Sequence, residues 1–244
     1  PMTMATRMTT PLTEAPVTGP ADNTLANPGL WQLISPGLPI GAFAYSQGLE
    51  TATETGWVRD AQGVESWLQG VLAHGLSRLD VPVLVRLRMA WDRGDDAEIR
   101  DWTRFLLASR ETAELRAEER HLGVALARLL AGLGVGEADD WQGDTPVTMA
   151  TMFALATSRW GIPTPSTTLG YAWSWLENQT MAAVKLVPLG QTDGQRILRR
   201  IGAALPALVR DGAALPDEAI GASLPGLQYA SMCHETQRTR LFRS

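Results

Sequence analysis

The sequence has 244 residues, of which 45% are hydrophobic and 19% are charged, and its net charge is -5 at pH 7. These values are typical of a globular protein and exclude a chain that is disordered throughout. The acidic balance argues against a dedicated nucleic-acid-binding protein, although it leaves room for a local basic patch. The single cysteine, Cys233, excludes an internal disulfide framework and any metal site built from several cysteines of one chain.

The sequence shows neither a transmembrane segment nor a secretory signal. No run reaches the roughly 18 uninterrupted apolar residues that a transmembrane helix needs. The first 27 residues lack the basic and then apolar pattern of a secretory signal. We therefore expect a cytoplasmic protein that has neither a membrane nor a nucleic acid as its partner.

Helical periodicity dominates the chain from residue 42 onward. Residues 1–27 are rich in Thr, Pro and Ala and are predicted to be a disordered tail, and a Pro/Gly loop follows them. Apolar residues then recur at spacings of three and four, which is typical of amphipathic helices. The helices are expected at 42–55, 60–74, 78–93, 96–109, 111–131, 148–160, 166–187 and 191–210. Residues 132–146 hold five Gly or Pro positions and are predicted to be a loop.

No segment alternates apolar and polar residues as a strand does, and no internal repeat is found. The sequence therefore predicts an all-α fold, a single helical domain of about eight helices with a disordered N-terminal tail. We place the helical domain at residues 28–227 and a C-terminal partner-docking tail at 228–244. Most of the nine tryptophans, Trp57 and Trp91 among them, fall on apolar helical faces and are interpreted as core residues, with interface anchors as the alternative for some of them.

Enzyme motifs give mostly negative results. The only lysine, Lys185, is followed by Leu186 and has no glycine-rich stretch before it, which excludes a P-loop nucleotide site. Ser46 lies in an A-x-S-x-G sequence, a variant of the nucleophile elbow, but the strand–turn–helix context that exposes such a serine is missing. We favour an ordinary helical serine and expect no catalytic residue. A small serine hydrolase using Ser46 stays open as the alternative, as does a generic helical interaction domain.

Possible metal ligands cluster near the end of the sequence. Cys233 and His234 are adjacent, and Glu235 follows them. The H-E-x-x-H zinc motif fails because Arg238 occupies its second histidine position. Two neighbouring ligands fix no coordination geometry. Cys233 and His234 are therefore weak candidates only, and no metal site is predicted.

Three stretches carry a resemblance to a known family. They are SPGLPIGAFAYSQGLE at 35–50, AAVKLVPLGQTDGQ at 182–195, and HETQ with RLFRS at 234–237 and 240–244. Together and in this order they resemble the UreF family of urease accessory proteins. The resemblance implies an all-α homodimer without catalytic activity that bridges the accessory protein UreD (also called UreH) and the GTPase UreG. That complex delivers nickel to apo-urease, so nickel would be in transit, GTP would belong to the partner, and no cofactor would be bound tightly.

The resemblance also directs attention to two groups of partner-binding residues. The first group, expected at the GTPase or dimer surface, comprises Pro39, Gly41, Phe43, Tyr45, Glu50, Lys185, Gln191 and Gln195. The second group, expected to face UreD, comprises Glu235, Arg240, Leu241, Phe242 and Arg243. Lys185 departs from the family pattern, where arginine is common, so a bidentate ion pair is not carried over.

Each group has a physical rationale and an alternative. A loop fixed by Pro and Gly loses little entropy on binding, which favours a binding surface at 36–41, whereas a rigid core turn is the alternative. The tail has too few apolar residues to offset its own ordering entropy, so we predict a mobile segment that orders against UreD. A tail packed on its own domain is the alternative there.

Overall fold

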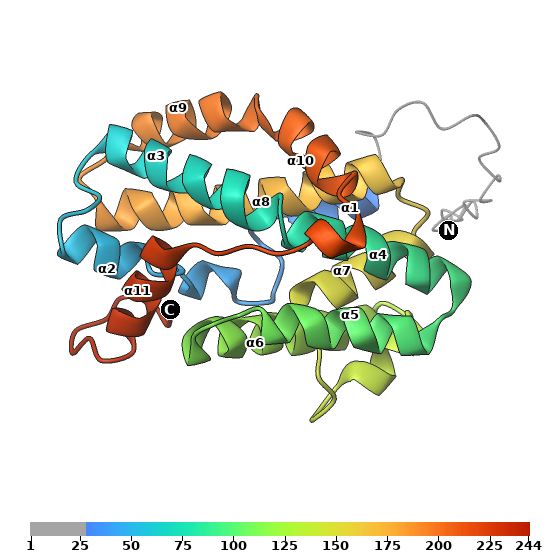
Figure 1. Ribbon diagram of the computed structural model, residues 1–244. Coiled ribbons are helices and arrows are strands. Elements are labelled where there is room, and N and C mark those ends of the chain that lie inside the picture. Colours follow the sequence, from blue (N-terminus) through green and yellow to red (C-terminus); the bar gives the residue numbers. More distant parts are fainter. Residues whose placement is uncertain (1–27) are drawn as a thin grey trace, which may run out of the picture.

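The computed structural model describes residues 28–244, and within them every regular element is helical (Figure 1). The prediction of an all-α fold is confirmed, but the expected number of about eight helices is too low, because the structure has eleven α-helices, α1 to α11. The predicted disordered tail, 1–27, lies outside the described residues. None of the helices in the described part is both long and apolar enough to cross a bilayer.

The helices follow one another with short connections. The α-helices are α1 (Pro28–Ile34), α2 (Leu49–Glu54), α3 (Ala61–Val71), α4 (Asp80–Arg93), α5 (Asp96–Ala108), α6 (Ala113–Gly132), α7 (Met149–Arg159), α8 (Thr164–Leu186), α9 (Gln191–Gly202), α10 (Leu205–Ala213) and α11 (Pro225–His234). The short segments are the 3-10 turns η1 (Ala42–Ala44), η3 (Gly136–Trp141) and η4 (Asp217–Ala219), and the π-helical η2 (Leu72–Leu76). Several helices begin at a polar cap, as where Asp60 Oδ1 accepts a hydrogen bond from the Gly63 amide.

Two apolar clusters make up the core. The first lies between α4, α5, α6 and α7, and the second lies between α2, α3, α8, α9 and α10. Helix α8, the longest at 23 residues, contributes Tyr171 to the first cluster and Leu176 to the second. Figure 1 shows α8 running through the middle of the molecule, with α9 and α10 on one side of it and α5 and α6 on the other. This central helix joins the two clusters into one body.

Two expected helices are interrupted. The expected helix at 42–55 is instead η1, an extended Tyr45, a left-handed pair at Gln47 (φ 52°) and Gly48 (φ 78°), and then α2. Gly48 is required here because a Cβ would lie 3.1 Å from the Ser231 amide nitrogen of α11. The expected helix at 191–210 divides into α9 and α10, because Pro206 lacks an amide hydrogen and fits only the first turn of a new helix.

The end of the chain also differs from expectation. Helix α11 starts at Pro225 and continues to His234, so the predicted boundary between residues 227 and 228 falls within a helix. The predicted loop at 132–146 contains η3, whose Ala138 and Trp141 are buried against the first cluster. Tertiary packing covers the apolar side chains of η3, whereas α11 buries only Ala230, Ser231 and His234.

Candidate partner-binding surfaces

The C-terminal segment, residues 235–244, folds back onto α2. Its contact is anchored by Glu50, whose carboxylate accepts hydrogen bonds from the amides of Leu241 (2.7 Å) and Phe242 (2.9 Å). The Phe242 ring is buried at 5% exposure, and the Lys185 ammonium lies 5.7 Å from its centroid. The structure therefore differs from the predicted mobile tail. The segment is packed on its own domain because a buried acid satisfies its amides and the core accepts its one buried aromatic ring.

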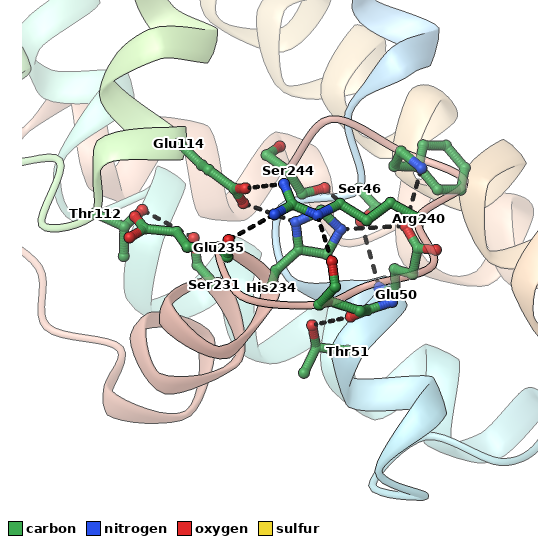
Figure 2. A network of polar contacts seen from close by, with 12 residues as sticks. Ser46, Glu50, Thr51, Thr112, Glu114, Ser231, His234, Glu235, Arg240 and Ser244 are labelled. Atoms are coloured by element: carbon green, nitrogen blue, oxygen red, sulfur yellow. Dashed lines mark hydrogen bonds and ion pairs between the residues drawn. The ribbon is translucent and has the colours of Figure 1, made fainter.

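A fully buried histidine holds this arrangement together (Figure 2). His234 Nδ1 lies 2.7 Å from Glu114 Oε2 of α6, and Nε2 lies 3.2 Å from Glu50 Oε2 of α2. The other Glu114 oxygen accepts a hydrogen bond from Arg240 at 2.8 Å. Each ring nitrogen therefore faces a carboxylate oxygen, one from α6 and one from α2. The network thus joins α2, α6, α11 and the C-terminal segment.

The last two residues pair with the chain just before α2. The Ser46 amide and hydroxyl both donate to the Ser244 main-chain oxygen, at 2.8 and 2.6 Å, and the Arg243 amide donates to Ala44 O at 2.8 Å. Ser46 Oγ also accepts a hydrogen bond from the Glu50 amide. Ser46 is completely buried, so its hydroxyl serves main-chain contacts and is not presented as a nucleophile. This geometry gives no support to the serine hydrolase alternative.

Glu118 of α6 is a buried acid next to the same segment. It accepts hydrogen bonds from Gln47 Nε2 at 2.8 Å and from Ser244 Oγ at 2.9 Å. Burial raises the pKa of Glu118 to about 7, and the two hydrogen bonds offset only part of that effect. Tyr45 is buried nearby, and its hydroxyl lies 3.1 Å from His121 Nδ1. Burial raises the pKa of Tyr45, while the neighbouring Arg243 lowers it.

The residues expected at the GTPase or dimer surface differ in how exposed they are. Phe43 is 67% exposed and Pro39 is also exposed, which agrees with the expected presentation of the loop. Lys185 is exposed too, and we call these three residues the loop surface. Gly41 has a left-handed conformation and is partly exposed, Tyr45 and Glu50 are buried, and Gln191 and Gln195 are exposed in the first two turns of α9.

The residues expected to face UreD also divide. Leu241 is 64% exposed, whereas its neighbour Phe242 is buried. Arg240 bonds Glu114, and Glu235 accepts a hydrogen bond from the Ala113 amide at the start of α6, so both side chains are engaged within the chain. Arg243 as a whole residue is exposed. Leu241 and Arg243 are therefore the members of this group that the packed segment presents outward.

An exposed apolar surface on α11 was not expected. Tyr229 stacks on Trp57 with ring centroids 5.8 Å apart, and Met232 follows one helical turn later. These three residues, which we call the α11 surface, are between 51% and 60% exposed. The interpretation of Trp57 as a core residue is wrong, while Trp91 is buried as expected. Exposed aromatic and methionine side chains of this kind are enriched at protein–protein interfaces.

The two weak metal candidates do not form a site. His234 has both ring nitrogens engaged with carboxylates, and Cys233 is partly exposed on α11. Within residues 28–244 no group of three or more His, Cys, Asp or Glu side chains could hold a metal ion.

The amino-acid sequence is similar to those of known proteins. The family model described as UreF matches residues 58–202. The chain is 51% identical over 227 residues to the urease accessory protein UreF of Alkalilimnicola ehrlichii, covering 91% of this chain and all of that protein. The chain belongs to the UreF family. It is also 48% identical to UreF of Hahella chejuensis over 88% of this chain and 96% of that protein. UreF of Azoarcus sp. is 47% identical over 93% of this chain and 99% of that protein.

The three UreF-like stretches of the sequence meet in space. Residues 35–50 carry Ser46 and Glu50, which bond the third stretch at Ser244 and Leu241. The second stretch, 182–195, contributes Lys185 against the ring of Phe242. The three stretches that carry the resemblance to the UreF family therefore contact one another at the C-terminal segment.

Proposed function

We propose that this chain is a non-catalytic scaffold in urease maturation that bridges UreD (UreH) and the GTPase UreG and regulates GTP-dependent nickel delivery to apo-urease. Family membership supports a role as a urease accessory protein. The sequence has no P-loop, so the nucleotide chemistry belongs to the GTPase. Nickel is treated as cargo in transit, and no cofactor is assigned to this chain.

One observation carries the bridging role. The C-terminal segment touches both candidate surfaces: its Phe242 lies against Lys185 of the loop surface, and the segment continues directly from α11. Arg243 also bonds the main chain at Ala44, next to Phe43. A partner seated on α11 and the segment therefore contacts an element that supports the loop surface. We assign UreD to α11 and Leu241, and UreG to the loop surface.

The chain is also proposed to act in the cytoplasm as a homodimer. Two exposed apolar side chains, Trp31 of α1 and Met181 of α8, lie on helices that pack together and supply an apolar face for a second copy. Light scattering of the purified chain at micromolar concentration should give twice the mass of 26.4 kDa. A stable monomer under these conditions would contradict the dimer.

Co-purification tests the bridging role. The tagged chain is expressed with UreD, UreG and the apo-urease subunits, and the retained proteins are identified. We expect all partners to be retained, UreG to be lost with Phe43→Ala, and UreD to persist in that variant. Met89→Ala, on an exposed part of α4, is the matched control. Retention of UreG by Phe43→Ala with an unchanged helical spectrum rules out the loop surface as its site.

A further inference from the structure

A groove next to the loop surface is lined by positively charged side chains. It has a volume of ≈ 890 Å³, and its lining includes Phe43, Arg116, Arg120, Arg128 and Arg243. None of the described residues that line it is Asp or Glu. The whole chain carries a net charge of -5, so this groove is a basic site on an acidic protein.

The arginines come mainly from one face of α6. Arg116, Arg120 and Arg128 are spaced four and eight residues apart, which places them within about a third of the helix circumference, and all three are exposed. Like charges four residues apart destabilise a helix. Within the described residues no ion pair is found for Arg120 or Arg128. The fold therefore gains nothing evident from this arrangement, which is expected if the arginines serve a ligand.

The acids of α6 point the other way. Glu114 bonds His234 and Arg240, Glu118 bonds Gln47 and Ser244, and Glu119 pairs with Arg110. Helix α6 thus turns its carboxylates into the molecule and leaves its guanidinium groups at the groove. Apolar side chains, Ile40 and Val124 among them, line the groove together with the arginines. A lining that combines apolar and cationic side chains fits a peptide segment that contains aliphatic and acidic residues.

We propose that this groove binds an acidic segment of the GTPase partner, with Arg120 and Arg128 as its main charge contacts. The inference rests on the proposed function, because it deepens the assignment of UreG to the adjoining loop surface. A nucleic acid is the less fitting occupant, since the net negative charge of the chain repels a long polyanion. Guanidinium groups pair with carboxylates in a bidentate geometry, which gives the groove selectivity for an acidic protein surface.

Charge reversal tests the groove with a matched control. The full chain, with UreD present, is titrated with purified UreG at about 50 mM and about 300 mM NaCl. The variant Arg120→Glu/Arg128→Glu is compared with Arg78→Glu/Arg210→Glu, which changes the net charge equally at exposed positions outside both proposed surfaces. We expect the α6 variant to bind UreG at least about tenfold more weakly at the lower salt concentration. The Arg78→Glu/Arg210→Glu control should bind as the unchanged chain does, whose own affinity falls with salt.

The other possible results of the titration separate a failure of the groove inference from a failure of the proposed function. If the unchanged chain binds UreG and the α6 variant binds equally well, the groove inference is wrong and the proposed function stands. If the unchanged chain does not bind UreG at all, the proposed function fails and the inference fails with it. Tighter binding of a short single-stranded RNA than of UreG would also overturn the inference. Arg120→Lys/Arg128→Lys, which keeps the charge, should retain most of the binding, and melting curves check that all variants fold.

Discussion

The core between α4 and α7 and the C-terminal segment are stabilised by different means. Around α4 and α7 the contacts are apolar, and Leu84, Leu87 and Phe153 are completely buried. In the segment, by contrast, the only buried apolar side chain is that of Phe242, and hydrogen bonds to Glu50 make the main contact. The core around α4 and α7 is thus stabilised by buried apolar surface, whereas the C-terminal segment is held by a few polar contacts that a binding partner could replace.

This difference predicts two levels of stability in one molecule. Local opening of a segment can cost much less free energy than global unfolding when few apolar contacts are lost. The segment should therefore detach from α2 while the helical core stays folded. A partner can then compete for the segment without disturbing the fold, as the proposed bridging role requires. The following predictions test this separation.

The largest effect is expected in the core. Phe153→Ala removes a fully buried ring that packs edge-to-face on Tyr171 and should lower the free energy of unfolding by about 4 kcal/mol. Urea denaturation followed by circular dichroism measures this loss. The control Phe105→Ala, at a partly exposed position of α5, should cost about 1 kcal/mol or less. Equal losses in the two variants would contradict the assigned core.

A smaller effect of opposite sign is expected at the junction of the two regions. Because the pKa of Glu118 is about 7 when folded and 4.5 ordinarily, the folded chain holds a proton that the unfolded chain releases between these values. The free energy of unfolding should fall as pH rises from about 4.5 to about 7. Glu118→Gln removes this cost and should stabilise the chain by about 3 kcal/mol at pH 8.

The pH dependence supplies the control for this variant. The stabilisation by Glu118→Gln should shrink as pH is lowered below 7 and disappear at about pH 3.5, where Glu118 is protonated in both states. Denaturation curves at several pH values measure the difference between the two proteins. A destabilised variant at pH 8 would show that the ionised carboxylate is required there.

The third prediction concerns the segment alone. Glu50→Gln leaves one acceptor oxygen for two amides, so the amides of Leu241 and Phe242 should exchange with solvent about tenfold faster. Hydrogen exchange measures this change, and global unfolding should shift by less than about 1 kcal/mol. Glu54→Gln, at an exposed site one turn later in α2, is the matched control. Unchanged exchange in Glu50→Gln would refute the anchoring role of this carboxylate.

The smallest effect on stability is expected at Leu241. Its side chain is 64% exposed, so Leu241→Ala should change the free energy of unfolding by less than about 0.5 kcal/mol. Binding of UreD should nevertheless weaken, because an exposed apolar anchor is lost. Isothermal titration with purified UreD measures the affinity, and Met89→Ala is the control at an exposed apolar site on α4. An unchanged affinity for UreD would remove Leu241 from the proposed interface.

The comparison also explains which features the sequence could predict. The helices of the core follow from local signals: apolar periodicity defines α4 to α8, and the cap at Asp60 marks the start of α3. Pro206 is a local signal of the same kind for the division between α9 and α10. Features that depend on neighbouring residues in the chain were therefore predictable.

Features that depend on distant residues were not. Glu50 is buried because residues 241 and 242 return to it, and the helix expected at 42–55 is interrupted because Ser244 and Arg243 pair with residues 44–46. A single sequence carries no pattern that links positions about 190 residues apart. The exposure of Trp57 was unpredictable for the same reason, because the ring on which it stacks, Tyr229, lies far away in the sequence on α11. Apolar periodicity shows which face of a helix is apolar, but it does not show whether another element packs against that face.

The separation of the anchoring residues along the chain has a consequence for synthesis. Glu50 lies 192 residues before Phe242, so α2 leaves the ribosome long before the segment that covers it. Contacts of such long range form late, because the intervening chain must first be ordered. Until translation reaches residue 242, Glu50 faces no segment amides and the start of α2 stays uncovered. The C-terminal segment therefore covers Glu50 and the start of α2 late in synthesis, after most of the helices have been translated.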